Sequence, residues 1–229
     1  MPKARRWPQN HRLKNMWLQE IWRYPVKSMR GESLASVELT QQGVAGDRIV
    51  LVRNQAGRTV TARSKPALLG HHATLGPDGE PKVDGRDWRS SEVAVDVEAA
   101  AGQGARLVSS DPENRFDILP LLVATGGMLA AVGYDRRRFR PNLVIAGVPG
   151  LSERAWEGGV LRIGEAVIGI EDLRSRCIMT TYDPDTLEQD LHVLTRVQEE
   201  FGGRLGLNCY VAAPGPVAVG DAVEFVPPR

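Results

Sequence analysis

Cysteine and histidine are scarce in this chain of 229 residues, which has two cysteines and four histidines. The cysteines, Cys177 and Cys209, lie far apart and form no C-x-x-C pair, so a disulfide framework is not expected and a reducing, cytoplasmic setting is favoured. None of the histidines shows metal-ligand spacing to either cysteine. A zinc site is therefore not expected.

A charge excess and a long apolar run are also missing. The sequence has 29 Lys and Arg against 28 Asp and Glu, a net charge of +1. Bulk electrostatic binding to nucleic acid or to an anionic membrane surface needs a marked basic excess, so neither partner is expected. No apolar segment approaches the roughly 20 residues of a membrane-spanning helix. With 42 % hydrophobic residues, the composition is that of a globular protein of one large or two small domains.

Several common catalytic motifs are absent. The sequence has no G-x-x-x-x-G-K-[ST], no G-x-S-x-G and no H-E-x-x-H. Gly102-Gln103-Gly104 lacks the third glycine of a dinucleotide-binding loop. Phosphate-loop, serine-hydrolase and zinc-protease chemistry are thereby not indicated.

Short β-like runs separated by Gly and Pro clusters make up most of the sequence. We predict strands at residues 17–23, 34–39, 48–53, 58–62, 93–97, 105–108, 142–146, 160–163, 166–170, 177–182, 209–213 and 222–226. Two helices are expected. One covers 125–132 with Thr125 as its N-cap, and the other has an apolar face formed by Leu187, Leu191, Leu194, Val197 and Phe201. The pattern predicts a mainly β (α+β) protein built as a barrel or sandwich.

A seam near residues 105–115 divides the sequence into two β-rich halves. We predict a disordered basic arm over 1–15, an N-terminal β-rich domain over 16–108 and a second domain over 109–229. The first nineteen residues contain no acid and no apolar stretch like that of a secretory signal. Alternative explanations of the arm are untranslated sequence before a start at Met16, or a targeting or partner-binding segment.

Cys177 lies between Arg174-Ser175-Arg176 and the polar pair Thr180-Thr181. A cysteine is ordinarily a small buried hydrophobe. Adjacent positive charge, however, favours the thiolate, which is the form that ligates soft metals. Cys209 has no such neighbours and precedes an apolar strand, so we interpret it as structural. Cys177 is the candidate metal ligand and catalytic residue.

Further cations form a second group of candidates. The run Arg136-Arg137-Arg138-Phe139-Arg140-Pro141-Asn142 could be a nucleic-acid patch, but the charge balance does not support that. We interpret residues 136–138 as a solvated face. Arg140 and Asn142 frame a proline before an apolar strand, where a fork donor and an amide suit a phosphate or a pterin-like ring edge. Tyr24-Pro25-Val26-Lys27-Ser28 and Gly46-Asp47-Arg48 also place cations at strand ends.

These segments together resemble MOSC-domain proteins, most closely the branch containing the mitochondrial amidoxime-reducing component and its bacterial relatives. The signature is Ser175-Arg176-Cys177-x-x-Thr180-Thr181-x-Asp183-Pro184-Asp185-Thr186. It is accompanied, in the family's order, by residues 24–28, 46–48, Val60-Thr61-Ala62-Arg63, 138–142 and 214–221. The resemblance implies a MOSC-type β-barrel with a few short helices, preceded by a smaller β-rich domain.

The resemblance also implies binding of the molybdenum cofactor (Mo-molybdopterin), with a cysteinate on molybdenum. That ligand falls on Cys177, and the implied cofactor-binding residues are Lys27, Ser28, Arg48, Thr125, Arg140, Asn142, Arg176 and Cys177 itself. The sequence departs from the family at the start of the short helix, where Gly126 and Met128 replace an acidic residue and a hydroxyl residue. That departure puts proton delivery in doubt.

Two functions are weighed above the others. The leading hypothesis is a molybdenum-dependent reductase of small N-hydroxylated substrates. The chain lacks the extra cysteines of a fused ferredoxin domain, so electrons would come from a separate protein of ferredoxin, flavin or haem type. The alternative is a non-catalytic carrier of the cofactor or of its sulfurated form. An RNA-binding β-barrel is a third and weaker hypothesis.

Overall fold

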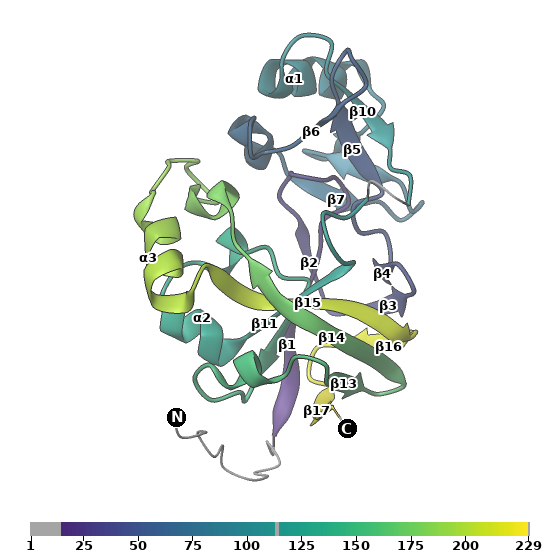
Figure 1. The fold of residues 1–229 in the computed structure, drawn as a ribbon. Helices are drawn as coiled ribbons and strands as arrows, with labels where there is room; N and C mark the ends of the chain where they lie inside the picture. Colours follow the sequence, from purple (N-terminus) through teal and green to yellow (C-terminus); the bar gives the residue numbers. More distant parts are fainter. Residues whose placement is uncertain (1–14, 113–114, 229) are drawn as a thin grey trace.

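The computed structural model describes residues 15–112 and 115–228, so all but the last residue of the basic arm lies outside the described part. The chain forms a β-barrel and, above it in Figure 1, a smaller part built from residues of the N-terminal half. The mainly β prediction is confirmed.

Seven strands close the barrel. Its order is β1, β12, β11, β15, β14, β13 and β17, and β1 pairs with both β12 and β17. The strands are β1 (Met16–Arg23), β11 (Leu121–Thr125), β12 (Leu143–Ala146), β13 (Val160–Ile163), β14 (Ala166–Ser175), β15 (Arg204–Ala213) and β17 (Ala222–Val226). Alternate side chains such as Leu18, Leu143, Ile145 and Leu161 point inward and are fully buried, because successive residues of a strand face opposite sides.

An eighth strand of the barrel sheet and one small separate sheet border the barrel. β2 (Glu32–Leu34) pairs with the end of β1. β3 (Ser36–Thr40) pairs with β4 (Gly43–Val44) and with β16 (Gly215–Ala218), which joins the first and last parts of the sequence. Residues from both halves of the chain therefore build the barrel region.

The N-terminal part has its own core. It contains the sheet of β5 (Val50–Arg53), β6 (Thr59–Val60) and β10 (Arg106–Ser109), and the sheet of β7 (Ala73–Leu75), β8 (Pro81–Val83) and β9 (Arg86–Asp87). The 3-10 helix η1 (Pro66–Gly70) and helix α1 (Ser91–Ala101) complete it. Val26, Met29, Val52, Leu68 and Val93 are buried together in its core.

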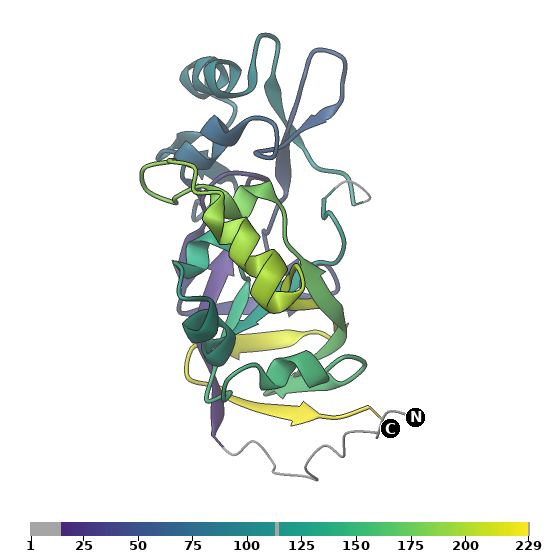
Figure 2. The same cartoon turned by 60° about the vertical axis from the view of Figure 1, so that its left-hand side comes forward.

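Helices cover one side of the barrel. The elements are α2 (Gly126–Val132), α3 (His192–Phe201) and the 3-10 helices η2 (Arg136–Arg138), η3 (Ser152–Ala155) and η4 (Ile178–Thr181). Figure 2 shows α3 lying across the front of the barrel. Met128, Val132, Phe139, Val193 and Val197 form a third buried cluster between α2 and α3. Within the described residues, no helix is long and apolar enough to cross a membrane.

The strand predicted at 93–97 is wrong, because these residues lie in helix α1. Val93, Val95 and Val97 alternate with polar residues as in a strand, yet Val95 is 66 % exposed. The buried positions are Val93, Val97 and Ala101, which follow the four-residue spacing of a helix. The hydroxyl of Ser90 accepts a hydrogen bond from the Val93 amide and so caps the helix.

Two other element predictions need correction. Residues 177–182 contain the 3-10 helix η4 instead of a strand, and the Thr180 and Thr181 hydroxyls donate to backbone carbonyls three residues earlier. The helix expected from Leu187 begins only at His192, and its buried face is Val193, Val197 and Phe201. Leu187 precedes it in a left-handed conformation. The helix after Thr125 is confirmed, with Thr125 as its N-cap.

Candidate functional site

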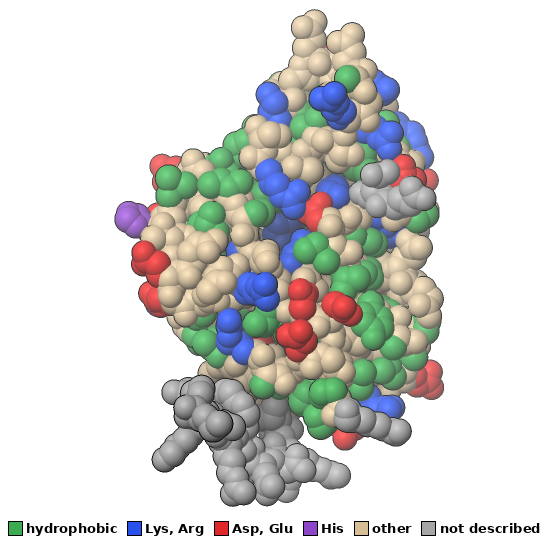
Figure 3. Space-filling model, in the orientation of Figure 1, with side chains coloured by type: hydrophobic (Ala, Val, Ile, Leu, Met, Phe, Trp, Pro, Cys, Tyr) green, Lys and Arg blue, Asp and Glu red, His purple; other side chains and the backbone are tan. Residues whose placement is uncertain are grey.

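A cavity of about 320 Å³ lies where the N-terminal part meets the barrel. Figure 3 shows Lys and Arg side chains gathered around a hollow in the middle of this face. Among the residues that line the cavity are these predicted site residues: Lys27, Ser28, Arg48, Arg140, Asn142, Arg176 and Cys177. The fold thus brings together seven of the eight residues predicted from sequence.

Three of these residues adopt a left-handed backbone conformation, which residues other than glycine rarely adopt. The φ angles are 72° at Ser28, 51° at Arg48 and 54° at Arg140. Two of the three residues form hydrogen bonds with neighbouring segments: the Ser28 hydroxyl accepts from the Ala62 amide at 3.0 Å, and the Arg48 amide donates to the Tyr24 carbonyl at 2.7 Å. Backbone strain of this kind gathers at functional sites. All three residues line the cavity.

Arg140 and Arg176 carry unused hydrogen-bond donors in the cavity wall. The Arg140 guanidinium lies 4.2 Å from the centre of the Tyr24 ring, and an Arg176 nitrogen donates to the Phe139 carbonyl at 2.6 Å. Nη2 of Arg140 and Nε of Arg176 are buried and have no hydrogen-bond partner within the described residues. Burial lowers the pKa of both guanidinium groups to about 10. Because a buried, unsatisfied cation is costly, this wall is suited to an anionic ligand.

Cys177 follows strand β14 and is half-buried beside a further arginine, Arg63. The Arg63 guanidinium pairs with the Asp117 carboxylate at 2.5 Å. Lys27 also pairs with Asp117, at 3.0 Å, and Arg174 lies 3.9 Å from it. The sequence-based prediction gave no role to Arg63, although Arg63 is the last residue of the family-like segment 60–63. Asp117 lies in none of the sequence motifs.

Asp117 stays ionised in this surrounding. Burial by itself raises its pKa, but the charges of Lys27 and Arg63 and their hydrogen bonds outweigh burial and lower the pKa to about 2. A carboxylate with this pKa is no proton donor near neutral pH. Its effect is to hold Lys27 and Arg63 in the cavity wall.

Asn142 lines the cavity, but its amide is already engaged with the backbone. Its Oδ1 accepts the Leu122 amide at 3.1 Å, and its Nδ2 donates to the Trp22 carbonyl at 3.3 Å. Asn142 therefore ties β11 to β1 beside the site. Asn142 therefore lies at the predicted site, but its side-chain amide forms hydrogen bonds with the backbone of two barrel strands.

Thr125 is the predicted site residue that the fold does not bring to this cavity. Its hydroxyl donates to Glu153 at 3.1 Å and accepts the Met128 amide, so its observed role is to cap α2. Gly126 and Met128 do not line the cavity either, and Met128 is buried in the helical cluster. The replacement of an acidic and a hydroxyl residue at these two positions therefore does not change the lining of this cavity.

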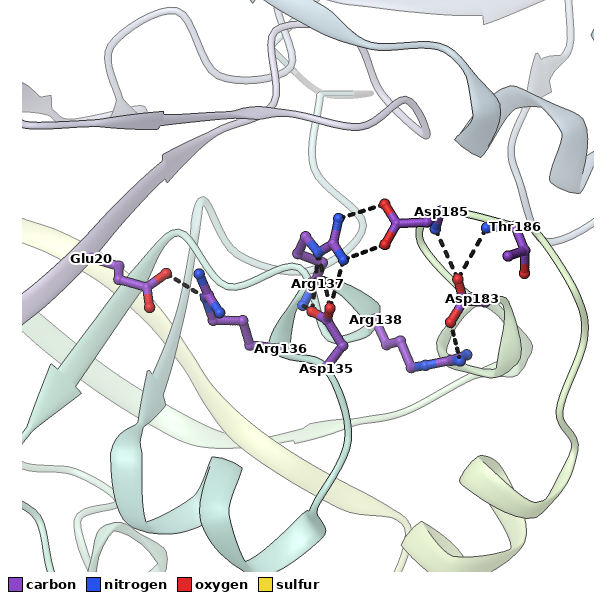
Figure 4. Close-up of polar contacts among 8 residues, drawn as sticks. All are labelled: Glu20, Asp135, Arg136, Arg137, Arg138, Asp183, Asp185 and Thr186. Carbon is purple, nitrogen blue, oxygen red and sulfur yellow. Dashed lines mark hydrogen bonds and ion pairs between the residues drawn. The ribbon is translucent and has the colours of Figure 1, made fainter.

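The basic run 136–138 divides differently from the prediction. Figure 4 shows Arg136 paired with Glu20, and Arg137 paired with Asp135 and Asp185, on the partly exposed side. Arg138 is not on a solvated face: its side chain is 10 % exposed and donates to Asp183 at 2.8 Å and to the Thr181 carbonyl. Arg138 also lines the cavity.

Two family models match the chain in sequence order. The MOSC N-terminal beta barrel domain matches residues 15–115, and the MOSC domain matches residues 127–224. This chain belongs to the MOSC family. The MOSC domain supplies Arg140, Asn142, Arg176 and Cys177 to the cavity, and the N-terminal domain supplies Lys27, Ser28 and Arg48.

Similar MOSC-related proteins include two human chains. The chain is 28 % identical to mitochondrial amidoxime-reducing component 1 of Homo sapiens, over 90 % of this chain and 82 % of that protein. It is 25 % identical to mitochondrial amidoxime reducing component 2 of Homo sapiens, over 80 % and 72 %. A shorter match, 34 % identical over 37 % of this chain and 10 % of that protein, is to the molybdenum cofactor sulfurase of Bombyx mori.

Among solved structures, the YUAD protein from Bacillus subtilis is similar over 92 % of this chain and 94 % of that chain. The TM-score is 0.47 and the sequence identity is 14 %.

The MOSC family relates this chain's function to the molybdenum cofactor.

Proposed function

We propose that this MOSC protein is a reductase of small N-hydroxylated compounds that binds the molybdenum cofactor, with the Cys177 thiolate as a metal ligand. The observation that carries the proposal is a half-buried thiol in a cavity walled by cations, two of which have unused buried donors. The names of the amidoxime-reducing relatives add support to the reaction class. Reduction of R–NHOH to R–NH₂ and water consumes two electrons and two protons.

The cavity residues fit an anionic cofactor that brings its own metal ligands. Among residues 15–112 and 115–228, no group of three or more His, Cys, Asp or Glu is arranged to hold a metal ion. A metal bound at Cys177 would therefore take its remaining ligands from the cofactor or substrate. A thiolate is a ligand that soft metals favour, and guanidinium forks suit phosphate.

When bound, the cofactor would supply the redox chemistry, and the protein's residues would bind and orient. Lys27, Arg48 and Arg140 would hold the anionic end of the cofactor. Arg63 would place a positive charge in the same cavity wall as the Cys177 sulfur. Asp117 would keep Arg63 in place without giving up a proton itself.

A carrier of the cofactor, or of its sulfurated form, is the second candidate. The match to a molybdenum cofactor sulfurase favours it, because that protein shares part of this sequence. A carrier needs the same anion-binding residues and the same thiol, so turnover is what separates the two functions.

Partners and compartment follow from the proposed chemistry. A reductase without a redox centre of its own other than the cofactor needs a separate electron donor of ferredoxin, flavin or haem type. Both cysteines are free, which suits a reducing cytoplasm. The amidoxime-reducing relatives are named as mitochondrial, which makes that compartment the alternative.

The test is a pair of cysteine variants expressed in a host that makes the cofactor. Cys177→Ala should abolish molybdenum retention, because it removes the ligand. Cys209→Ala is the control: Cys209 is fully buried in the barrel, and burial raises the pKa of its thiol far above its usual range. The Cys209 variant should keep its molybdenum. Metal and pterin content per folded chain are measured, with circular dichroism as the check of folding.

Turnover is then measured on the loaded protein with an aromatic amidoxime or a hydroxylamine and a strong artificial electron donor. Molybdenum with turnover supports the reductase. Molybdenum without turnover favours the carrier. Equal molybdenum content in the Cys177 variant and the parent would contradict the ligand assignment in either function.

A further inference from the structure

A second cavity, of about 440 Å³, lies beside the first. Its walls come from the end of β1, from residues 30–33 and 69–72 of the N-terminal part, and from segments 137–140 and 179–184. Three residues, Arg138, Arg140 and Met179, line both cavities. Cys177, Lys27 and Arg63 line the first cavity and are absent from the walls of the second. The second cavity therefore adjoins the proposed cofactor site but has mostly different lining residues.

The second cavity is mostly apolar, and three aromatic residues line it. The rings of Trp22, Tyr24 and Tyr182 form part of its wall, together with the side chains of Leu69 and Met179. Aromatic walls of this kind favour a flat ring, which can stack on them or meet them edge to face. The volume is within the range of cavities that take small organic molecules.

Most charged groups in this wall are already paired. Glu32 accepts from Arg23 at 2.8 Å and from the Leu75 amide at 2.8 Å, and Arg138 is bound to Asp183. Arg30 differs: one Nη donates to the Gly70 carbonyl at 2.7 Å, while its buried Nε has no partner within the described residues. Arg140, shared with the first cavity, also has an unused Nη2. Arg30 is therefore the arginine of this wall that has an unpartnered nitrogen and no place in the proposed cofactor site.

We propose that the second cavity binds a planar aromatic carboxylate. The ring would occupy the space between the aromatic side chains, and the carboxylate would pair with the Arg30 guanidinium. An ionised acceptor satisfies a buried guanidinium donor better than a neutral group does. A flat ring also keeps the cation–aromatic contacts of this wall, such as Arg140 over Tyr24.

The test is calorimetric titration of the full chain with 2-naphthoate, without metal or reductant. We expect saturable binding, about tenfold or more weaker after Arg30→Met, because one charge-assisted hydrogen bond is lost. Tyr182→Leu, which removes a ring, should also weaken binding. The matched control is Arg58→Met at an exposed arginine, which should change nothing. 2-Naphthamide, which keeps the ring and lacks the charge, should bind more weakly than 2-naphthoate.

Location is tested with Arg63→Met, which alters the first cavity alone. Unchanged 2-naphthoate affinity in this variant, with a loss in Arg30→Met, supports the second cavity. The reverse pattern would place the anion in the first cavity and overturn the proposal, as would the absence of binding at millimolar 2-naphthoate. Because the titration needs neither molybdenum nor turnover, its failure is distinct from failure of the proposed reductase.

Discussion

At the scale of single residues, Asp117 is the main departure from the cation-lined site expected from sequence. Its carboxylate lies among Lys27, Arg63 and Arg174, where an anionic ligand is also proposed to bind. Its pKa of about 2 lies below the ordinary 3.8, so ionised Asp117 stabilises the folded chain. That stabilisation is fully present above about pH 4 and is lost as the pH falls toward 2.

Asp117→Asn should lower the free energy of unfolding at pH 7 by up to about 2 kcal/mol, the free-energy equivalent of the lowered pKa. It should also make the loss of stability between pH 4 and pH 2 less steep than in the parent. Urea unfolding across this pH range measures both. Asp185→Asn is the control, because Asp185 is 61 % exposed and its pair with Arg137 is screened by solvent. Parallel curves for the parent and the Asp117 variant would show that Asp117 does not stabilise the fold.

At the scale of elements, the start of α2 depends on a close approach of two backbone segments. A Cβ at Gly127 would lie 2.2 Å from the Gly150 carbonyl oxygen and 2.5 Å from that of Val148. A Cβ at Gly126 would meet nothing closer than 3.8 Å. The two neighbouring glycines therefore have different roles, and only the second is required by packing against the loop after β12.

Gly127→Ala should destabilise the fold by about 1–3 kcal/mol, because the added methyl group forces the two backbone segments apart. Gly126→Ala, at the adjacent position, should not destabilise it, since alanine is the better helix former. Thermal and urea unfolding of the pair measure the difference. Equal stability of the two variants would mean that the loop moves aside easily.

At the scale of the whole molecule, the barrel and the sequence halves do not coincide. Strand β1, from the segment matched by the N-terminal family model, closes the barrel by pairing with β12 and β17. The sequence-based division at 108/109 remains a prediction about folding units. The topology adds that the later half on its own lacks one barrel strand.

A fragment of residues 109–229 should therefore fail to unfold cooperatively, because its barrel would be left open between β12 and β17. A chain that joins residues 15–40 to 115–229 through a flexible linker restores β1 and should regain a cooperative transition. Denaturant unfolding followed by circular dichroism and amide NMR dispersion measures both. A stable, well-dispersed 109–229 fragment would contradict this expectation.

The sequence by itself determined what depends on short segments. Cys177 just after two arginines, the motifs around Lys27, Arg48 and Arg140, and most barrel strands are local patterns. The cavity gathers the residues that those motifs contain. These signals are readable because a thiol beside cations and a strand between turns are each made by neighbouring residues.

Tertiary structure alone decided the contacts between distant segments. Asp117 joins Lys27 and Arg63 only because the fold brings three separated segments to one cavity, and the sequence carries no sign of that pairing. Thr125 is turned to Glu153 by the start of α2, although its place in the sequence equally allowed a site contact. Valines that alternate like a strand became helix α1, because capping by Ser90 and burial of one helical face outweighed the period of two. Burial and long-range pairing are set by the whole chain, so local patterns leave them open.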